Sequence, residues 1–180
     1  MKKFTALLLC AVLLMTPLCG CKKGEGKYLT QTKPGTVSQD LSPTTLTFTN
    51  VTAKAGEEIE VKLSANTPST LFGFSWEINY DSSVMKPVDI VESEELKANF
   101  NIEHNKTNNP LTLQGDGKEI KNYTLEGDVA TFIFRLEADA APGNYPIEIR
   151  CKNDDAGNNI NVDAYEIPFT PATATVTVEQ

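Results

Sequence analysis

The chain has very little of what most enzymes use for catalysis. Its 180 residues include one histidine, His104, which excludes zinc sites built on two or three histidines and nucleophiles paired with a second histidine. No G-x-S-x-G, H-E-x-x-H or phosphate-binding glycine loop is present. Carboxylates are plentiful and leave a glycosidase pair open, although most of them fall in predicted turns or on the polar sides of predicted strands. We therefore expect that the protein is not an enzyme and that His104 has a structural role.

Basic charge and cysteine are also scarce. The formal net charge of −8 argues against nucleic acid as a partner, because binding to phosphates requires basic patches. Three of the four cysteines lie within the first 21 residues, which leaves Cys151 without a partner for an intramolecular disulfide. Cys151 continues the apolar alternation of residues 145–149, and we interpret it as a small buried residue.

Long hydrophobic runs are absent except near the N-terminus. Residues 4–15 (FTALLLCAVLLM) follow two lysines, and this apolar run is too short to span a bilayer comfortably but suits a signal peptide. Residues 18–21 (LCGC) resemble a bacterial lipobox, in which the cysteine, here Cys21, is lipidated and becomes the mature N-terminus. We expect a lipoprotein signal peptide over residues 1–20; the alternative is an ordinary secretory signal cut nearby.

The rest of the chain divides into a linker and one domain. Residues 21–44 begin with the lipidated cysteine and are polar, without sustained periodicity, which predicts a flexible linker. Residues 45–180 are long enough for a single domain with a sizeable core. We expect an extracytoplasmic protein at the cell surface, held to the membrane by its lipid alone, because an acidic chain does not adsorb to anionic headgroups.

Apolar and polar residues alternate from residue 45 onward, which predicts β-structure. Turn residues separate eight or nine short strands, a pattern typical of an antiparallel β-sandwich. Turns are predicted at 115–117 (GDG) and 127–128 (GD), among others. The stretch 93–98 (SEELKA) can form a turn of helix, and it overlaps a strand predicted over 96–105, in which Leu96, Ala98, Phe100 and Ile102 point inward.

Few aromatic residues are available for stacking against a sugar ring. Trp76, the only tryptophan, has the same strand parity as Phe74 and Ile78, which predicts that it lies in the core. Tyr123 and Tyr165 are the remaining candidates for exposed sugar-binding platforms. A carbohydrate-binding β-sandwich module, with a polysaccharide as partner, is therefore the alternative function.

Asparagine and aspartate gather at residues 152–163 (KNDDAGNNINVD). The order of ligands found in an EF-hand loop is missing, and the same residue types dominate turns. We favour a turn over a metal site here, and leave open whether 153–163 binds calcium.

Polar side chains line the outward face of two predicted strands and a neighbouring one. Asparagine and glutamine are not favoured in strands, but their amides can donate and accept hydrogen bonds at a low desolvation cost. The residues alone leave a partner-binding face and a merely soluble face equally open. Asn105 continues the second strand, and the candidate partner-binding residues are Gly73, Ser75, Glu77, Asn79, Asn99, Asn101, Glu103, Thr112 and Gln114.

The order of four segments resembles that of the cohesin family. These are 51–63 (VTAKAGEEIEVKL), 71–90 (LFGFSWEINYDSSVMKPVDI), 126–147 (EGDVATFIFRLEADAAPGNYPI) and 172–178 (ATATVTV). Cohesins share an A-x-x-G-x-x-x-x-V opening, a strand ending in Tyr-Asp-x-x-Val/Leu, an A-T-I-x-F strand after a glycine turn, and an Ala-Pro-Gly turn. The resemblance covers nearly all of the predicted domain.

The resemblance implies a nine-stranded jelly-roll sandwich with no activity or cofactor of its own. Cohesins bind dockerins, small calcium-loaded modules on polysaccharide-degrading enzymes, and so assemble cellulosomes; the calcium belongs to the dockerin. The family binds through its third, fifth, sixth and eighth strands, which would include the polar residues above. The chain departs from the family pattern at Gly73 and Ser75, where cellulosomal members have Asn-x-Asp, and at 113–115, where they have Ala-Glu-Asp.

Overall fold

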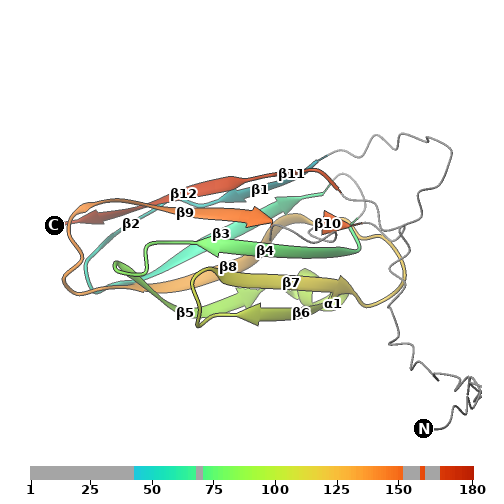
Figure 1. Cartoon of the computed structure of the whole chain (residues 1–180), viewed down its shortest axis with the longest axis horizontal. Helices are drawn as coiled ribbons and strands as arrows, with labels where there is room; N and C mark the ends of the chain where they lie inside the picture. The colour runs from blue at the N-terminus through green and yellow to red at the C-terminus, as the bar shows by residue number, and fades with distance from the viewer. Residues whose placement is uncertain (1–42, 68–70, 152–158, 161–166) are drawn as a thin grey trace, which may run out of the picture. The chain divides into compact units, whose positions relative to one another are not determined.

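The computed structural model describes residues 43–67, 71–151, 159–160 and 167–180. Within these ranges it contains twelve strands and one short helix, arranged in two facing sheets (Figure 1). The predicted signal peptide, Cys21, nearly all of the predicted linker, most of the 152–163 segment and Tyr165 lie outside the described residues.

The first sheet has five strands, and β3 and β8 form its centre. In spatial order they are β11 (Phe169–Thr170), β1 (Thr44–Phe48), β3 (Glu58–Asn66), β8 (Glu126–Leu136) and β5 (Met85–Glu92). The β5 strand contains a register shift between Pro87 and Asp89, so that Val88 has no partner on β8 and is 43% exposed.

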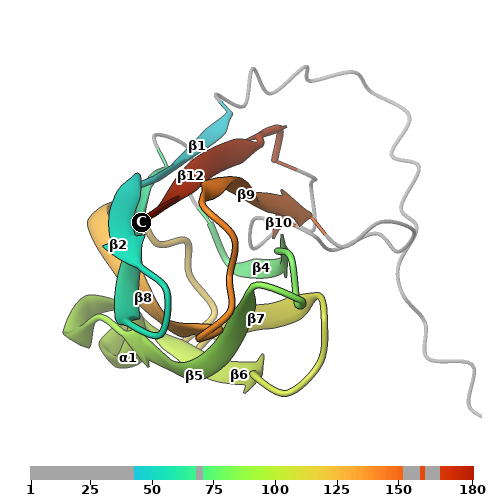
Figure 2. The same cartoon turned by 90° about the vertical axis from the view of Figure 1, so that its left-hand side faces the viewer.

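The second sheet has seven strands, and its central strand β4 has neighbours on both sides. In spatial order the sheet contains β2 (Val51–Lys54), β12 (Ala172–Glu179), β9 (Gly143–Cys151), β4 (Gly73–Asn79), β7 (Leu111–Gly117) and β6 (Phe100–Asn105), while β10 (Asn159–Ile160) also pairs with β4. Figure 2 looks along the strands and shows β4, β7 and β6 following one another on one side of the sandwich, with β8 and β5 on the other.

The predicted class, an all-β sandwich with jelly-roll topology, is confirmed. Ten of the described strands have four or more residues, one more than the nine predicted. Most pairings are antiparallel, but β1 pairs with β11 and β2 with β12 in parallel. The turn predicted at 115–117 is wrong, because these residues belong to β7, and the turn predicted at 127–128 lies within β8, where Gly127 has a positive φ of 91°.

The core between the sheets is built around the inward side chains of β4. Phe74, Trp76 and Ile78 are at most 3% exposed, which confirms the predicted core position of Trp76. The rings of Phe74 and Trp76 stack with centroids 4.1 Å apart, and the Trp76 indole N–H donates a hydrogen bond to Asn159 Oδ1 at 3.0 Å. The indole nitrogen is therefore satisfied inside the core, as a buried donor must be.

A glycine on β7 makes room for this aromatic packing. Gly115 lies opposite Phe74 in the β4–β7 register, and a Cβ atom at position 115 would lie 2.5 Å from Phe74 Cε1 and 3.0 Å from Ile102 Cδ1. Real Cβ atoms essentially never approach a ring that closely. The close approach of β7 to the Phe74 ring therefore requires glycine at position 115.

Replacing Gly115 with alanine is expected to destabilise the fold without changing its surface. The added methyl group meets a buried ring and overpacks the core, which should lower the free energy of unfolding by about 1–3 kcal/mol. Thermal unfolding followed by circular dichroism measures the change.

Gly143→Ala is the matched control for this prediction. A Cβ atom at position 143 would lie at an ordinary distance of 3.5 Å from the Tyr145 ring, so its expected effect is within about 0.5 kcal/mol. Equal losses of stability in the two variants would contradict the role assigned to Gly115.

Candidate partner-binding face

The candidate face is the outer surface of β9, β4, β7 and β6, and the strand register brings the predicted polar residues together on it. On one row, Ser75 of β4 pairs with Gln114 of β7, which in turn pairs with Glu103 of β6. Directly opposed side chains in such pairs have Cβ atoms about 4.5–5.5 Å apart. The row therefore forms a polar strip across three strands, in which the Ser75 hydroxyl oxygen is buried and the Glu103 side chain is exposed.

A second row and its neighbours complete the face. Glu77 pairs with Thr112, which pairs with Asn105, and on the next strand Glu77 also lies opposite Arg150. Asn79 lies opposite Glu148 of β9 on the same face. The side chains of this row are partly or fully exposed and available to a partner.

Two of the predicted residues differ from the remaining seven. Gly73 keeps its place in the β4 column, opposite Asp116, but it is buried and also pairs with Ile160 of β10. Asn99 lies in a helix, so its predicted place on a strand face is wrong. Asn101 and Glu103 lie on β6 and are exposed, as predicted.

The helix α1 (Glu94–Asn99) replaces the first half of the strand predicted over 96–105. Ser93 caps its N-terminus, accepting a hydrogen bond from the Leu96 N–H at 3.1 Å, and acidic residues occupy the first turn, where the helix dipole favours them. Leu96 is buried but Ala98 is exposed, so the predicted inward position of Ala98 is also wrong. The hydrogen bond that caps the helix at Ser93 therefore favours helix over the strand that the apolar alternation predicts.

Three charged residues of the face are absent from the predicted set. Asp116 lies opposite Asn101 on the outer side of β7. It is not included in the predicted face because residues 115–117 are predicted to form a turn. Glu148 and Arg150 alternate with the buried Ile147 and Ile149 on β9, and this alternation is the signal that could have placed them. An Arg150 guanidinium nitrogen lies 2.6 Å from Glu148 Oε2.

Three carboxylates on the face have no neutralising partner in the part of the chain that the structure describes. These carboxylates belong to Glu77, Glu103 and Asp116. On the outer face of the five-stranded sheet, Glu58 is paired with Arg135 at 3.0 Å and Asp128 with Lys62 at 3.8 Å, while the exposed Glu60 and Glu126 have no ion pair with a described residue. Both outer faces therefore carry unpaired negative charge, and on the candidate face it lies within and beside the polar strip.

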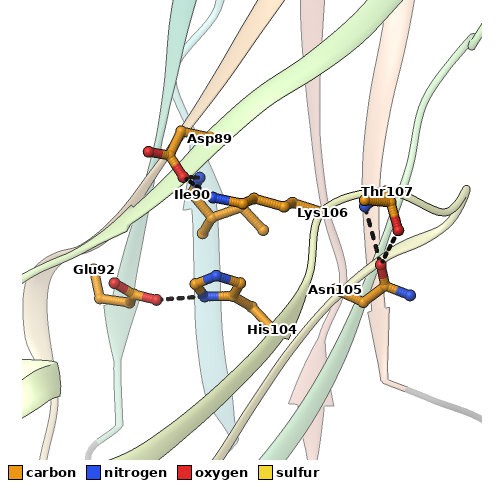
Figure 3. A network of polar contacts seen from close by, with 7 residues as sticks. All are labelled: Asp89, Ile90, Glu92, His104, Asn105, Lys106 and Thr107. Carbon is orange, nitrogen blue, oxygen red and sulfur yellow. Dashed lines mark hydrogen bonds and ion pairs between the residues drawn. The ribbon is translucent and has the colours of Figure 1, made fainter.

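Two polar pairs connect β5 of the opposite sheet with the end of the edge strand β6, one through His104 within the strand and one through Lys106 directly after it (Figure 3). His104 Nδ1 lies 2.6 Å from Glu92 Oε1, and since a carboxylate only accepts, the imidazole N–H donates. Lys106 Nζ lies 2.7 Å from Asp89 Oδ1. The hydrogen bond from Lys106, followed by that from the Ile90 N–H, lowers the pKa of Asp89. His104 therefore has the structural contact expected of it.

The predicted sugar-binding platform at Tyr123 is wrong. Tyr123 is 7% exposed, its ring centroid is 5.0 Å from that of Phe100, and Lys121 Nζ lies 5.0 Å from the ring centroid. Tyr123 forms an isolated antiparallel β-bridge with the buried Leu71, and this backbone pairing places the Tyr123 ring in the core. Among the side chains that the structure describes, none of the aromatic ones is exposed.

The described residues also lack other recognisable sites. They contain no group of three or more His, Cys, Asp or Glu that could hold a metal ion. Over the same ranges, no helix has the length and apolar character needed to cross a membrane.

Comparison with known proteins identifies the family. Residues 44–164 match the family model described as Cohesin domain, while no curated protein matches the chain. The chain is similar to CaCohA2 of Clostridium acetobutylicum in its complex with a CaDoc0917 variant, with 18% identity, a TM-score of 0.61, and 76% of this chain and 99% of that one covered.

Two further solved structures show the same fold. One is the Coh-OlpA–Doc918 cohesin–dockerin complex from Clostridium thermocellum, with 15% identity, a TM-score of 0.58, and 75% of this chain and 99% of that one covered. The other is a non-cellulosomal cohesin from Archaeoglobus fulgidus, with 12% identity, a TM-score of 0.58, and coverages of 76% and 92%. Since the family model spans well over half of the 180 residues, the chain belongs to the cohesin domain family.

Proposed function

We propose that the outer face of β9, β4, β7 and β6 binds a dockerin-bearing protein. The observation that carries this proposal is the polar strip across three adjacent strands, with the unpaired carboxylates of Glu77, Glu103 and Asp116 within it. Support also comes from similar structures such as the Coh-OlpA complex, described as a cohesin–dockerin complex. The protein acts as a binding module rather than as an enzyme.

The chemistry of the face favours a partner with basic and hydrogen-bond-donating groups. The carboxylates accept hydrogen bonds from lysine or arginine, and such charge-assisted bonds are about twice as strong as neutral ones. The amides of Asn101 and Gln114 can both donate and accept. Because the face is rigid sheet, binding costs little ordering of the cohesin side.

The N-terminal signals suggest where this binding takes place. Lipidation of Cys21 and the flexible linker over residues 21–44 would hold the domain outside the cell membrane. In this arrangement the partner is a secreted enzyme that degrades polysaccharide, retained at the cell surface by its dockerin. Labelling cells with a radioactive fatty acid would test lipidation, which Cys21→Ser should abolish.

Charge reversal on the face is expected to weaken binding without unfolding the domain. Glu77→Arg and Asn101→Arg each place a cation where we expect the partner's cations, which should raise the Kd for a dockerin about tenfold or more. Isothermal titration calorimetry with a purified dockerin measures the change. A loss of folding in either variant would show that the outward orientation of that side chain is wrong.

Glu60→Arg provides the matched control for charge reversal. Glu60 is exposed on β3, in the opposite sheet, so the variant makes the same charge change away from the face. Its Kd should equal that of the unaltered protein. An equal weakening by Glu60→Arg would point to long-range charge rather than to a defined face.

Capture from the source organism's secreted proteins tests the nature of the partner. Beads carrying the protein should retain dockerin-bearing enzymes when calcium is present and release them when a chelator is added, because the dockerin folds around calcium and the cohesin does not. Mass spectrometry identifies the captured proteins. Retention that is indifferent to the chelator would argue against a dockerin.

A further inference from the structure

The strand β6 is the outermost strand of the candidate face and is supported on one side only. Among the described strands it pairs with β7 alone. Its inward side chains lose apolar contact along the strand: Phe100 is 1% exposed, Ile102 is only partly buried, and the third is the polar His104. The apolar core therefore holds the start of β6 but not its end, which carries Glu103 and Asn105.

The inter-sheet pairs His104–Glu92 and Lys106–Asp89 occur where this apolar support ends (Figure 3). Successive side chains of a strand point to opposite faces, so residue 104 lies inward between the outward Glu103 and Asn105. Both pairs reach β5, which belongs to the opposite sheet. Holding residues 104 and 106 therefore fixes the backbone that presents Glu103 and Asn105.

The two pairs differ in how far they are shielded from water. The side chains of His104 and Glu92 are 29% and 15% exposed, whereas those of Lys106 and Asp89 are 43% and 45% exposed. Loss of one partner from a shielded hydrogen-bonded pair leaves the other polar group without a partner away from water, which costs more than the same loss at an exposed site. We therefore expect the Glu92–His104 pair to contribute more to the position of β6.

We propose that Glu92, His104, Asp89 and Lys106 are positioning residues for partner binding. They hold the end of β6 against the opposite sheet so that Glu103 and Asn105 are presented in register with Gln114 and Thr112, and they do this from the inner side of the strand. The proposal rests on the proposed function of the face. Without the pairs, binding must also order the end of β6, and that ordering lowers affinity.

Amide hydrogen exchange tests the positioning itself, with no partner present. Glu92→Gln keeps the size of the side chain but removes its charge, and we expect faster exchange over residues 100–106 while β4 and β9 are unchanged. Glu58→Gln is the matched control, because it removes one carboxylate from the Glu58–Arg135 pair, which lies in the same sheet as Glu92 but makes no contact with β6. Unchanged exchange in β6, or equal changes in all strands, would overturn the proposal.

A double-mutant cycle with a purified dockerin tests the link to binding. We expect Glu92→Gln to raise the Kd about fivefold, a typical size for coupling through residues outside the interface. The effect of Glu103→Ala should shrink in the Glu92→Gln background, because β6 no longer presents that carboxylate in place. The effect of Glu77→Ala on β4 should be the same in both backgrounds.

The outcomes separate positioning from a general loss of stability. Additive effects with both Glu103→Ala and Glu77→Ala would overturn the proposal, as would an unchanged Kd in the Glu92→Gln variant. The double variant Glu92→Lys with His104→Glu, which again places a donor opposite an acceptor, should recover much of the affinity. If no dockerin binds even the unaltered protein, the proposed function fails, and the exchange rates of β6 alone decide whether the pairs position the strand.

Discussion

The contact between the Phe74 ring and the backbone of Gly115 organises the sheet that carries the candidate face. The ring stacks on Trp76 from its own strand and meets Phe100 of β6 edge-on, with centroids 5.4 Å apart. One aromatic cluster on the inner side thus joins β4, β7 and β6. The same three strands present the polar strip on their outer side, so an apolar contact inside the core aligns the groups that face water.

Each outer face of the sandwich carries both paired and unpaired carboxylates. On the five-stranded sheet, the carboxylates of Glu58 and Asp128 are neutralised by basic residues, while that of Glu60 has no ion pair with a described residue. On the candidate face, described carboxylates such as that of Glu77 are left without a partner. Charge that a protein leaves uncompensated on a rigid sheet costs little while water solvates it, and it is available to a molecule that brings the opposite charge.

Much of the fold could be predicted from alternation, because each strand has one side in the core. The inward set of β4 and the outward positions of Glu77 and Asn101 follow from parity alone. Parity does not reveal where a strand begins. Ser93 caps the helix α1, which contains Ala98 and Asn99, so these two residues do not occupy the strand positions predicted for them. Glycine in a sequence usually indicates a turn. Gly115 lies within a strand because the neighbouring Phe74 ring leaves no room for a Cβ atom, which the sequence does not show.

The rest of the site depends on contacts between distant segments, which a local pattern does not contain. Tyr123 is isolated in sequence, which suggests a surface residue, yet its bridge to Leu71 places it against Phe100. The His104–Glu92 and Lys106–Asp89 pairs join segments that are separated along the chain, and the local sequence around each residue does not predict its partner. Their partners become evident only when the two sheets are placed face to face.

The register shift in β5 has a consequence for the behaviour of many copies side by side. As an end strand, β5 exposes backbone groups to which a strand of another molecule could add. Pro87 lacks the N–H needed for a regular ladder, and the extra residue Val88 interrupts its spacing. The interrupted edge offers no continuous template for intermolecular β-pairing, so molecules crowded together are protected from fibrous aggregation along this side.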